Sequence, residues 1–245
     1  MTERLYLDDA YATWADAMVT AHTPEGGIIV DRSVFYPTGG GQPGDSGRLE
    51  WSDTEGRACR MEIATAIKSD AFAIALIPAE PAALPPVGTP VRQIIDADRR
   101  LGHMRVHTAL HLLSVVLPLP VTGGAVGPDK GRLDFDMTEP PSDKTALEGD
   151  LNALIWRDLP VHASWISDSD LRARPELVKT MSVAPPMGEG QVRLIRIGEV
   201  EADTVDLQPC GGTHVASTGE IGAVRIGKIE KKGRQNRRVY IHLTS

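Results

Sequence analysis

The stretch 97-ADRRLGHMRVHTALHLLSVVL-117 decides the fold of the larger part of this chain. Asp96 or Asp98 can cap a helix that begins here, and Pro118 cannot continue one. Its apolar residues recur at a spacing close to the helical repeat of 3.6 residues, at Leu101, Met104, Leu110, Leu113 and Leu117. The stretch therefore predicts a helix over residues 97–117.

Two histidines of this predicted helix, His107 and His111, are four residues apart and so lie one turn apart on one face. His103 continues the same stripe one turn earlier. Such a pair alone is more often an ordinary pair of helix residues than a pair of metal ligands. Far downstream, Cys210-Gly211-Gly212-Thr213-His214 repeats the spacing in a turn, where the two glycines supply backbone freedom.

Together these pairs supply three imidazoles and one thiolate, a donor set suited to tetrahedral Zn²⁺. We therefore expect one Zn²⁺ per chain, held by His107, His111, Cys210 and His214. With an exchangeable position the metal would activate a water or position a substrate, whereas four permanent ligands would make it structural. His103 is a candidate base or partner of a metal ligand, with a plain core-edge histidine as the alternative.

Bulk composition indicates a soluble globular protein, because 41% of its 245 residues are hydrophobic and 24% are charged. No run approaches the roughly 18 apolar residues that span a bilayer, and the N-terminus does not resemble a signal peptide. We expect a cytoplasmic protein with no membrane partner. Two cysteines cannot form a disulfide framework, and Cys59 is expected to be a buried strand thiol.

The clearest linker is 79-AEPAALPPVGTP-90, in which four prolines disfavour helix and central strand. Short β-like runs separated by turns precede it, so residues 1–90 are predicted to form a small antiparallel barrel or sandwich. Residues 91–245 are predicted to be an α+β domain with helices packed on an antiparallel sheet. Beyond the first helix we expect strands at 131–137, 161–167, 193–208 and 222–243, helices at 143–159 and 169–178, and a loop at 188–190.

The net charge of −7 does not favour nucleic acid as a partner. The distribution of the basic residues along the chain, however, does favour it. Between residues 225 and 238 one acid, Glu230, accompanies seven basic residues: Arg225, Lys228, Lys231, Lys232, Arg234, Arg237 and Arg238. This segment should form a hairpin that turns at Lys232-Gly233. It is either a solvated surface or, being close in sequence to His214, a phosphate-binding surface. Arg100 and Arg105 of the predicted helix are further candidates to meet phosphate, with solvated helix arginines as the alternative.

The segment 35-FYPTGGGQPGDSG-47 contains five glycines and two prolines. It is neither a Walker loop nor a dinucleotide fingerprint, because no Gly-Lys-Ser/Thr and no helix follow it. Such a segment usually serves turn geometry, but its glycines also let backbone N–H groups approach a ligand closely.

In combination, FYPTGGGQPGDSG, DADRRLGHMRVHTALHLL and QPCGGTHVASTGEIG resemble the alanyl-tRNA editing proteins, in the family's order and across essentially the whole chain. These proteins are relatives of the editing domain of alanyl-tRNA synthetase and of the second N-terminal domain of threonyl-tRNA synthetase. The resemblance is to the medium-length form, which lacks the additional C-terminal tRNA-binding domain of the long form.

The resemblance implies a zinc-dependent hydrolase that deacylates tRNA(Ala) mischarged with serine, or with glycine, and spares Ala-tRNA(Ala). The resemblance implies that His107, His111, Cys210 and His214 are the zinc ligands. It implies that the following residues bind the substrate: Gly39, Gly40, Gly41, Gln42, Thr122 and Thr213. Thr122 is the candidate reader of the serine hydroxyl, although VTGGAVGPDKG departs from the family pattern and a common glutamine is missing there. The resemblance also implies that the partner is mischarged tRNA(Ala). The protein itself is expected to be a monomer or a homodimer.

Two other interpretations remain open from the sequence. A different zinc hydrolase, such as an amidase, would explain the four ligands but not the basic C-terminal segment. The second is a non-catalytic RNA-binding module, in which zinc would only stabilise the fold.

Overall fold

The computed structural model describes residues 1–179, 187, 190–199 and 203–244. They form two compact units, Met1–Leu101 and Gly102–Ser245, called here the N-terminal unit and the C-terminal unit. The units divide between Leu101 and Gly102, not at the linker 79–90, because Pro90–Ile95 is a strand of the first unit. Of the loop expected at 188–190, residues 188 and 189 lie outside the described residues.

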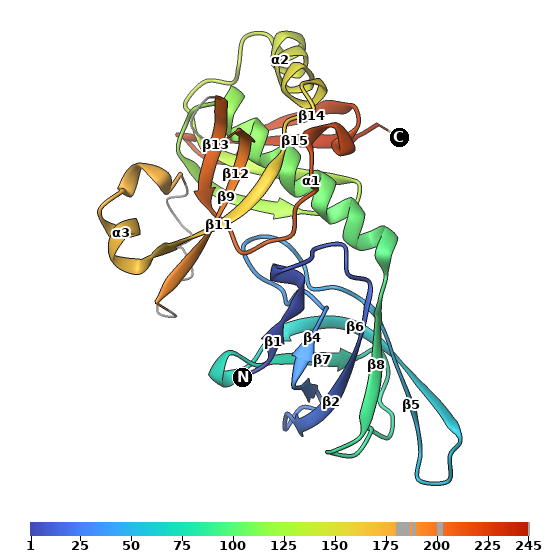
Figure 1. Ribbon diagram of the computed structural model, residues 1–245. Helices are drawn as coiled ribbons and strands as arrows, with labels where there is room; N and C mark the ends of the chain where they lie inside the picture. Colours follow the sequence, from blue (N-terminus) through green and yellow to red (C-terminus); the bar gives the residue numbers. More distant parts are fainter. Residues whose placement is uncertain (180–186, 188–189, 200–202, 245) are drawn as a thin grey trace. The chain divides into compact units, whose positions relative to one another are not determined.

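The N-terminal unit is a closed antiparallel barrel with the strand order β2-β3-β7-β6-β5-β8 (Figure 1). Its strands are β2 Trp14–His22, β3 Ile28–Val30, β5 Gly47–Ser52, β6 Ala58–Lys68, β7 Ile74–Pro78 and β8 Pro90–Ile95. Smaller elements are β1 Glu3–Arg4, which pairs with β4 Arg32–Ser33, and the 3₁₀ turns η1 Leu5–Leu7 and η2 Asp70–Phe72. The barrel interior is apolar, with Ile28, Phe35, Leu49 and Leu76 completely buried. The predicted barrel is thus confirmed.

Two features of this unit differ from the expectations. Pro90, expected to end a linker, instead begins β8, a position at which a strand tolerates a residue without an N–H donor. Cys59 is half-buried rather than buried, because it lies near the end of the β5–β6 hairpin, opposite Trp51.

The C-terminal unit contains a four-stranded antiparallel sheet of order β14-β15-β10-β9 and a three-stranded antiparallel sheet of order β11-β12-β13. The first consists of β9 Val121–Val126, β10 Lys130–Asp136, β14 Val224–Lys231 and β15 Asn236–Leu243. The second consists of β11 Val161–Ser167, β12 Gln191–Glu199 and β13 Asp203–Pro209. The predicted hairpin is confirmed as β14–β15, whereas β9 is not predicted by the sequence, because its two glycines resemble a loop.

The helices largely follow the sequence signals. In α1 (Ala97–Val116), Asp96 caps the start, since its Oδ1 accepts a hydrogen bond from Arg99 N at 3.0 Å. Asp143 caps α2 (Lys144–Trp156) in the same way. The helix expected at 169–178 is split into α3 (Asp168–Arg172) and the 3₁₀ turn η3 (Pro175–Leu177), because a residue before proline avoids helical geometry. A further 3₁₀ turn, η4, spans Thr218–Ile221.

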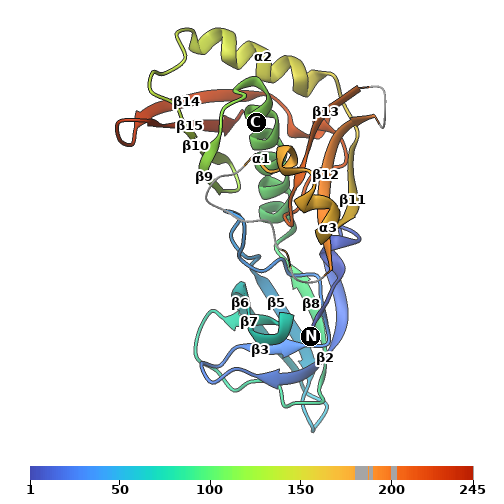
Figure 2. The ribbon, with the colours of Figure 1, turned by 90° about the vertical axis from the view of Figure 1, so that its left-hand side faces the viewer.

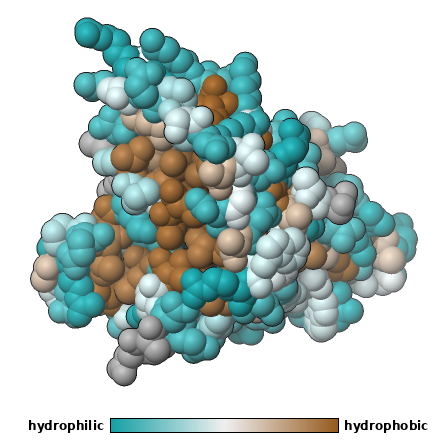
Figure 3. Space-filling view, turned by 90° about the horizontal axis from the view of Figure 1, so that it is seen from above, coloured by the Kyte–Doolittle hydropathy of each residue, from teal (hydrophilic) through white to brown (hydrophobic). Residues whose placement is uncertain are grey.

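Helix α1 lies between the two sheets of the C-terminal unit, and α2 covers β14 (Figures 1 and 2). The absence of a side chain at Gly131 of β10 allows this close packing, because a Cβ there would lie 2.5 Å from Val106 Cγ1 of α1. Hydrophobic residues gather into a band on the surface seen from above (Figure 3). None of the described helices combines the length and apolar composition needed to cross a bilayer.

Candidate metal centre

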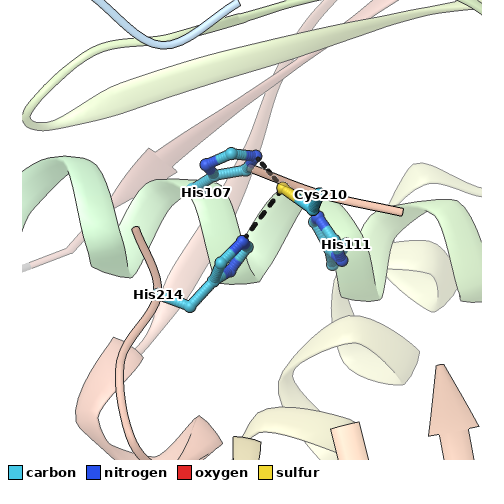
Figure 4. A group of neighbouring side chains, drawn as sticks. All are labelled: His107, His111, Cys210 and His214. Atoms are coloured by element: carbon cyan, nitrogen blue, oxygen red, sulfur yellow. Dashed lines mark hydrogen bonds between the residues drawn. The ribbon is translucent and has the colours of Figure 1, made fainter. Parts of the chain in front are cut away.

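Four side chains from two distant segments meet in the C-terminal unit. His107 and His111 come from α1, and Cys210 and His214 come from the segment that follows β13 (Figure 4). Their potential ligand atoms all lie within 4.8 Å of one another, and all but the half-buried Cys210 are buried. The structure therefore brings together the predicted pairs.

The spacing of these atoms fits a tetrahedral metal ion. Cys210 Sγ lies 3.5 Å from His107 Nε2 and 3.2 Å from His214 Nε2. Zinc–sulfur and zinc–nitrogen bonds of about 2.3 and 2.0–2.1 Å at tetrahedral angles would separate such ligands by roughly 3.6 Å. No pair of ligand atoms exceeds this separation by more than about 1 Å, since all lie within 4.8 Å of one another, so small shifts of the side chains would bring all four to an ion.

A buried carboxylate orients His111. Asp206 Oδ2 lies 2.9 Å from His111 Nδ1, and its Oδ1 accepts a hydrogen bond from Lys179 Nζ at 2.5 Å. Gln208 Nε2 donates to Asp206 Oδ2 at 2.8 Å. The pKa of Asp206 is raised by burial but lowered more by His111 and Lys179, to about 2, so the carboxylate is ionised. Its hydrogen bond holds a proton on Nδ1 and leaves Nε2 of His111 to face the cluster.

The environment of His111 also favours a positive charge. Burial lowers its pKa, but hydrogen bonds with Asp206 and Cys210 outweigh this effect and raise the pKa to about 9. A metal cation bound at Nε2 would take the place of the second proton that this pKa represents.

Thr108 orients His214 in a similar way. The Thr108 hydroxyl donates to Met104 O at 2.9 Å, so its oxygen accepts from His214 Nδ1 at 3.1 Å and from Val215 N at 3.3 Å. The proton of His214 is therefore placed on Nδ1, and Nε2 is left toward Cys210. Burial and the nearby His107 lower the pKa of His214 to about 3, which keeps this imidazole neutral.

The surroundings of the Cys210 thiol lower its pKa. Burial raises its pKa, but His107 and His214 lower it to well below the usual range of a thiol. The thiolate is the form that binds a metal.

The side chain of an arginine holds the turn that carries Cys210. The guanidinium of Arg193 on β12 donates to Gly212 O at 2.8 Å and to Cys210 O at 3.3 Å. Neither Gly211 nor Gly212 is among the described glycines with positive φ.

Three further residues of the C-terminal unit were predicted to be catalytic or to bind the substrate. His103 is buried in α1 and is not a member of the four-ligand cluster. Thr213, which precedes His214 in the sequence, is completely buried. Thr122 on β9 already uses its hydroxyl within the sheet, since it donates to Asp134 O at 3.1 Å and accepts from Asn236 Nδ2 at 2.6 Å.

The Gly-rich segment belongs to the N-terminal unit, where it forms a tight turn. Gly39 and Gln42 exchange backbone hydrogen bonds of 3.0 Å, and Gly40 and Gly41 between them have φ values of 57° and 83°. Gly40 and Gly41 are exposed, while Gln42 is buried. The turn therefore presents backbone at its tip, and the Gln42 side chain lies inside.

A buried ion pair anchors this segment to the start of α1. Arg100, only 2% exposed, donates to both oxygens of Asp45, and Asp45 also accepts from Tyr36 N at 2.6 Å. Neither interpretation of Arg100 from the sequence, a phosphate contact or a solvated helix arginine, is correct, because its guanidinium is buried in this internal pair. Arg105 donates from its Nε to Ile221 O at 2.9 Å.

The basic segment divides into exposed and committed side chains. Arg225, Lys228, Lys231, Lys232 and Arg234 are exposed on the β14–β15 hairpin, although Lys228 and Lys232 pair with Glu230. Arg238 pairs with Asp134 at 2.7 Å. Arg237 is 6% exposed and donates to the carbonyls of Thr138, Gly233 and Asn236, so it closes the end of the hairpin.

Sequence reasoning missed the residues that support the ligands: Thr108, Lys179, Arg193, Asp206 and Gln208. One signal was present. Asp206 and Gln208 precede Cys210 at alternate positions of a strand, so all three belong to one face. The contribution of Lys179 and Arg193, from other segments, had no local signal.

Comparison with known proteins agrees with this geometry. Residues 192–240 match the family described as the threonyl and alanyl tRNA synthetase second additional domain. The chain is 34% identical to the alanyl-tRNA editing protein AlaX-M of Methanosarcina acetivorans, with 99% of each chain covered. It is 32% identical to AlaX-L of Pyrococcus horikoshii, covering 96% of this chain and 56% of the relative. With the alanine–tRNA ligase of Korarchaeum cryptofilum it shares 33% identity, covering 94% of this chain and 25% of the ligase. The chain belongs to the family of alanyl-tRNA editing proteins.

Proposed function

We propose that this editing protein hydrolyses the ester bond of tRNA(Ala) mischarged with serine, or with glycine, and spares Ala-tRNA(Ala). The observation that carries the proposal is the buried cluster of three imidazoles and one thiol, in a chain that aligns with an editing protein over 99% of its length. The same cluster is proposed to hold one Zn²⁺ per chain, which when bound supplies a Lewis acid for the substrate or for water.

The residues of the chain itself perform the positioning. Asp206 and Thr108 fix the protons of His111 and His214 on Nδ1, which keeps their Nε2 lone pairs available. Arg193 holds the carbonyls on either side of the Cys210 turn. An aminoacyl ester is already activated, so a site that orients it meets most of the demands of hydrolysis.

Selectivity against alanine requires groups that hydrogen-bond the serine hydroxyl. Alanine is serine without that hydroxyl, and a site whose polar groups would be left unpaired rejects the analogue by up to ~10⁴–10⁵. We propose that Gly39, Gly40, Gly41, Gln42, Thr122 and Thr213 supply substrate contacts. Since the Thr122 hydroxyl is engaged with Asp134 and Asn236, its role as the hydroxyl reader requires a further contact through its oxygen.

Release of the amino acid from Ser-, Gly- and Ala-tRNA(Ala), with and without a chelator, tests the proposal. We expect serine release that the chelator abolishes and zinc restores, with Ala-tRNA(Ala) left intact. Hydrolysis of small amides in the absence of RNA would instead favour an amidase. Retention of tRNA without turnover would favour a binding module with a structural metal.

A further inference from the structure

Trp165 is an exposed aromatic residue at the edge of the three-stranded sheet. It lies in the edge strand β11, and its side chain is 50% exposed, although tryptophan is highly buried on average. The exposed Trp14 of the barrel is covered by the Arg92 guanidinium, 4.9 Å from its ring. Among the described residues, no ring or cation contact of this kind involves Trp165.

The register of the sheet places Trp165 on the same face as the supports of the metal centre. Trp165 is opposite Arg193, and Ala163 is opposite Ile195, whose partner on β13 is Gln208. Because alternate residues of a strand share a face, Trp165 shares its face with Gln208 and Asp206. Those two side chains contact His111 of α1, so this is the face beside α1 (Figure 2).

The pairing of the strands also gives an approximate distance between the backbones of Trp165 and Cys210. Arg193 is its partner on β12, and Arg193 O accepts a hydrogen bond from Cys210 N at 3.0 Å. The three residues thus form a row across the sheet. With adjacent strands about 4.8 Å apart, the backbone of Trp165 is roughly 10 Å from that of Cys210. This is the span of one nucleoside, from the ester on its ribose to the far edge of its base.

We propose that Trp165 stacks on the terminal adenine of the tRNA while the ester lies at the four-ligand cluster. The proposal rests on the proposed function, because it assumes an aminoacyl-tRNA substrate. The 3′ end of a tRNA is single-stranded, and proteins bind single-stranded bases by stacking them on aromatic side chains. Ala163, the neighbour of Trp165 on the same face, is small and exposed, which leaves room beside the indole.

Binding of a hydrolysis-resistant mimic to the full-length, zinc-loaded protein tests this assignment. The probes are serine joined by an amide to 3′-amino-3′-deoxyadenosine, and the same conjugate with a ribose that lacks the base. Stacking of one base corresponds to an affinity change of about 5- to 150-fold. We expect Trp165→Ala to weaken binding of the adenosine conjugate at least fivefold, Trp165→Phe to retain most of it, and all three proteins to bind the base-free conjugate equally.

A matched control is Trp156→Ala, which removes another exposed indole, 62% exposed, from α2. This variant should bind both conjugates as the wild type does, and the zinc content of all variants should be equal. Equal affinity of Trp165→Ala and wild type for the adenosine conjugate would overturn the assignment. So would an equal reduction in affinity for the base-free conjugate, or a change of oligomeric state in Trp165→Ala that accounts for the weaker binding. A wild type that binds adenine through Trp165 but releases no serine would overturn the proposed function and leave the stacking site standing.

Discussion

At the scale of the single residue, the metal centre depends on which atom of each imidazole carries a proton. Asp206 and Thr108 accept hydrogen bonds from Nδ1 of His111 and His214, and this decides that Nε2 faces Cys210 and the other ligands. The ligands alone do not specify this orientation, since an imidazole can bind a metal through either nitrogen. The supporting residues are therefore as informative about the site as the ligands.

Cys210→Ala should remove most of the bound metal. The thiolate would be the one anionic ligand of the set, and the nearby His107 and His214 lower the pKa of this thiol, which favours the thiolate. Elemental analysis of the purified variant measures the effect. The half-buried Cys59 of the barrel provides the control, because Cys59→Ala should keep a full complement of zinc. Near-stoichiometric zinc in Cys210→Ala would contradict the ligand assignment.

Asp206→Asn should weaken zinc binding by about 10- to 100-fold without abolishing it. Asparagine can present its amide to His111 Nδ1 but carries no negative charge, and it also loses the ion pair with Lys179. Competition with a chromogenic chelator measures the affinity.

The matched control for that change is Asp203→Asn on the same strand, where the exposed carboxylate pairs with Arg157 away from the ligands. Its zinc affinity should equal that of the wild type. Equal affinities for all three proteins would show that the Asp206 contact does not support the metal site.

At the scale of the element, charge in the sequence does not translate directly into a binding surface. The β14–β15 hairpin carries seven basic residues between 225 and 238, yet Arg237 is buried at its end and Arg238 is paired with Asp134. We propose that the exposed part of the hairpin, with Arg225, Lys231 and Arg234, contacts the phosphates of the tRNA acceptor stem. Arg237 and Arg238 instead stabilise the hairpin through their contacts with backbone carbonyls and with Asp134.

Arg225→Gln, Lys231→Gln and Arg234→Gln together should raise the KM for Ser-tRNA(Ala) and flatten its dependence on salt. For every phosphate that the variant no longer binds, the slope of log affinity against log salt should fall by ~0.7–0.9. Zinc content should not change, because none of the three side chains belongs to the metal cluster. Arg57→Gln and Arg60→Gln, exposed on the β5–β6 hairpin, control for the removal of positive charge in general. If the triple variant keeps the wild-type KM and salt slope, the hairpin is a solvated surface.

The Arg100–Asp45 pair predicts a second effect at this scale. Asp45→Ala leaves a guanidinium of 2% exposure without its carboxylate, and breaking a buried pair in this way costs about 3–5 kcal/mol. The unfolding transition of the N-terminal unit in urea should move to a lower midpoint accordingly. Asp16→Ala, which removes the partner of Arg92 at the barrel surface, should hardly move it. Equal midpoints for the two variants would show that Arg100 finds another partner.

At the scale of the whole molecule, the sequence predicted what local patterns encode. The capped α1, the barrel strands and the β14–β15 hairpin each carry their own periodicity and turn signals. The cluster of His107, His111, Cys210 and His214 was predicted because two short motifs of one spacing suggest one site. The strand β8 was missed because prolines before it suggested a linker that ended the unit. The roles of Lys179 and Arg193 depend on contacts between segments far apart in the chain, which single-sequence patterns do not contain.

Zinc should stabilise one unit of the molecule and not the other. All four ligands lie within Gly102–Ser245, and they join α1 to a segment about a hundred residues later. A ligand at 100 times its dissociation constant stabilises the state it binds by about 2.7 kcal/mol. Hydrogen exchange followed by mass spectrometry should therefore show added zinc slowing exchange in peptides of the C-terminal unit, with no change in the barrel peptides of 1–95. Cys210→Ala should lose this protection. Equal protection across both units would show that they unfold as a single cooperative body.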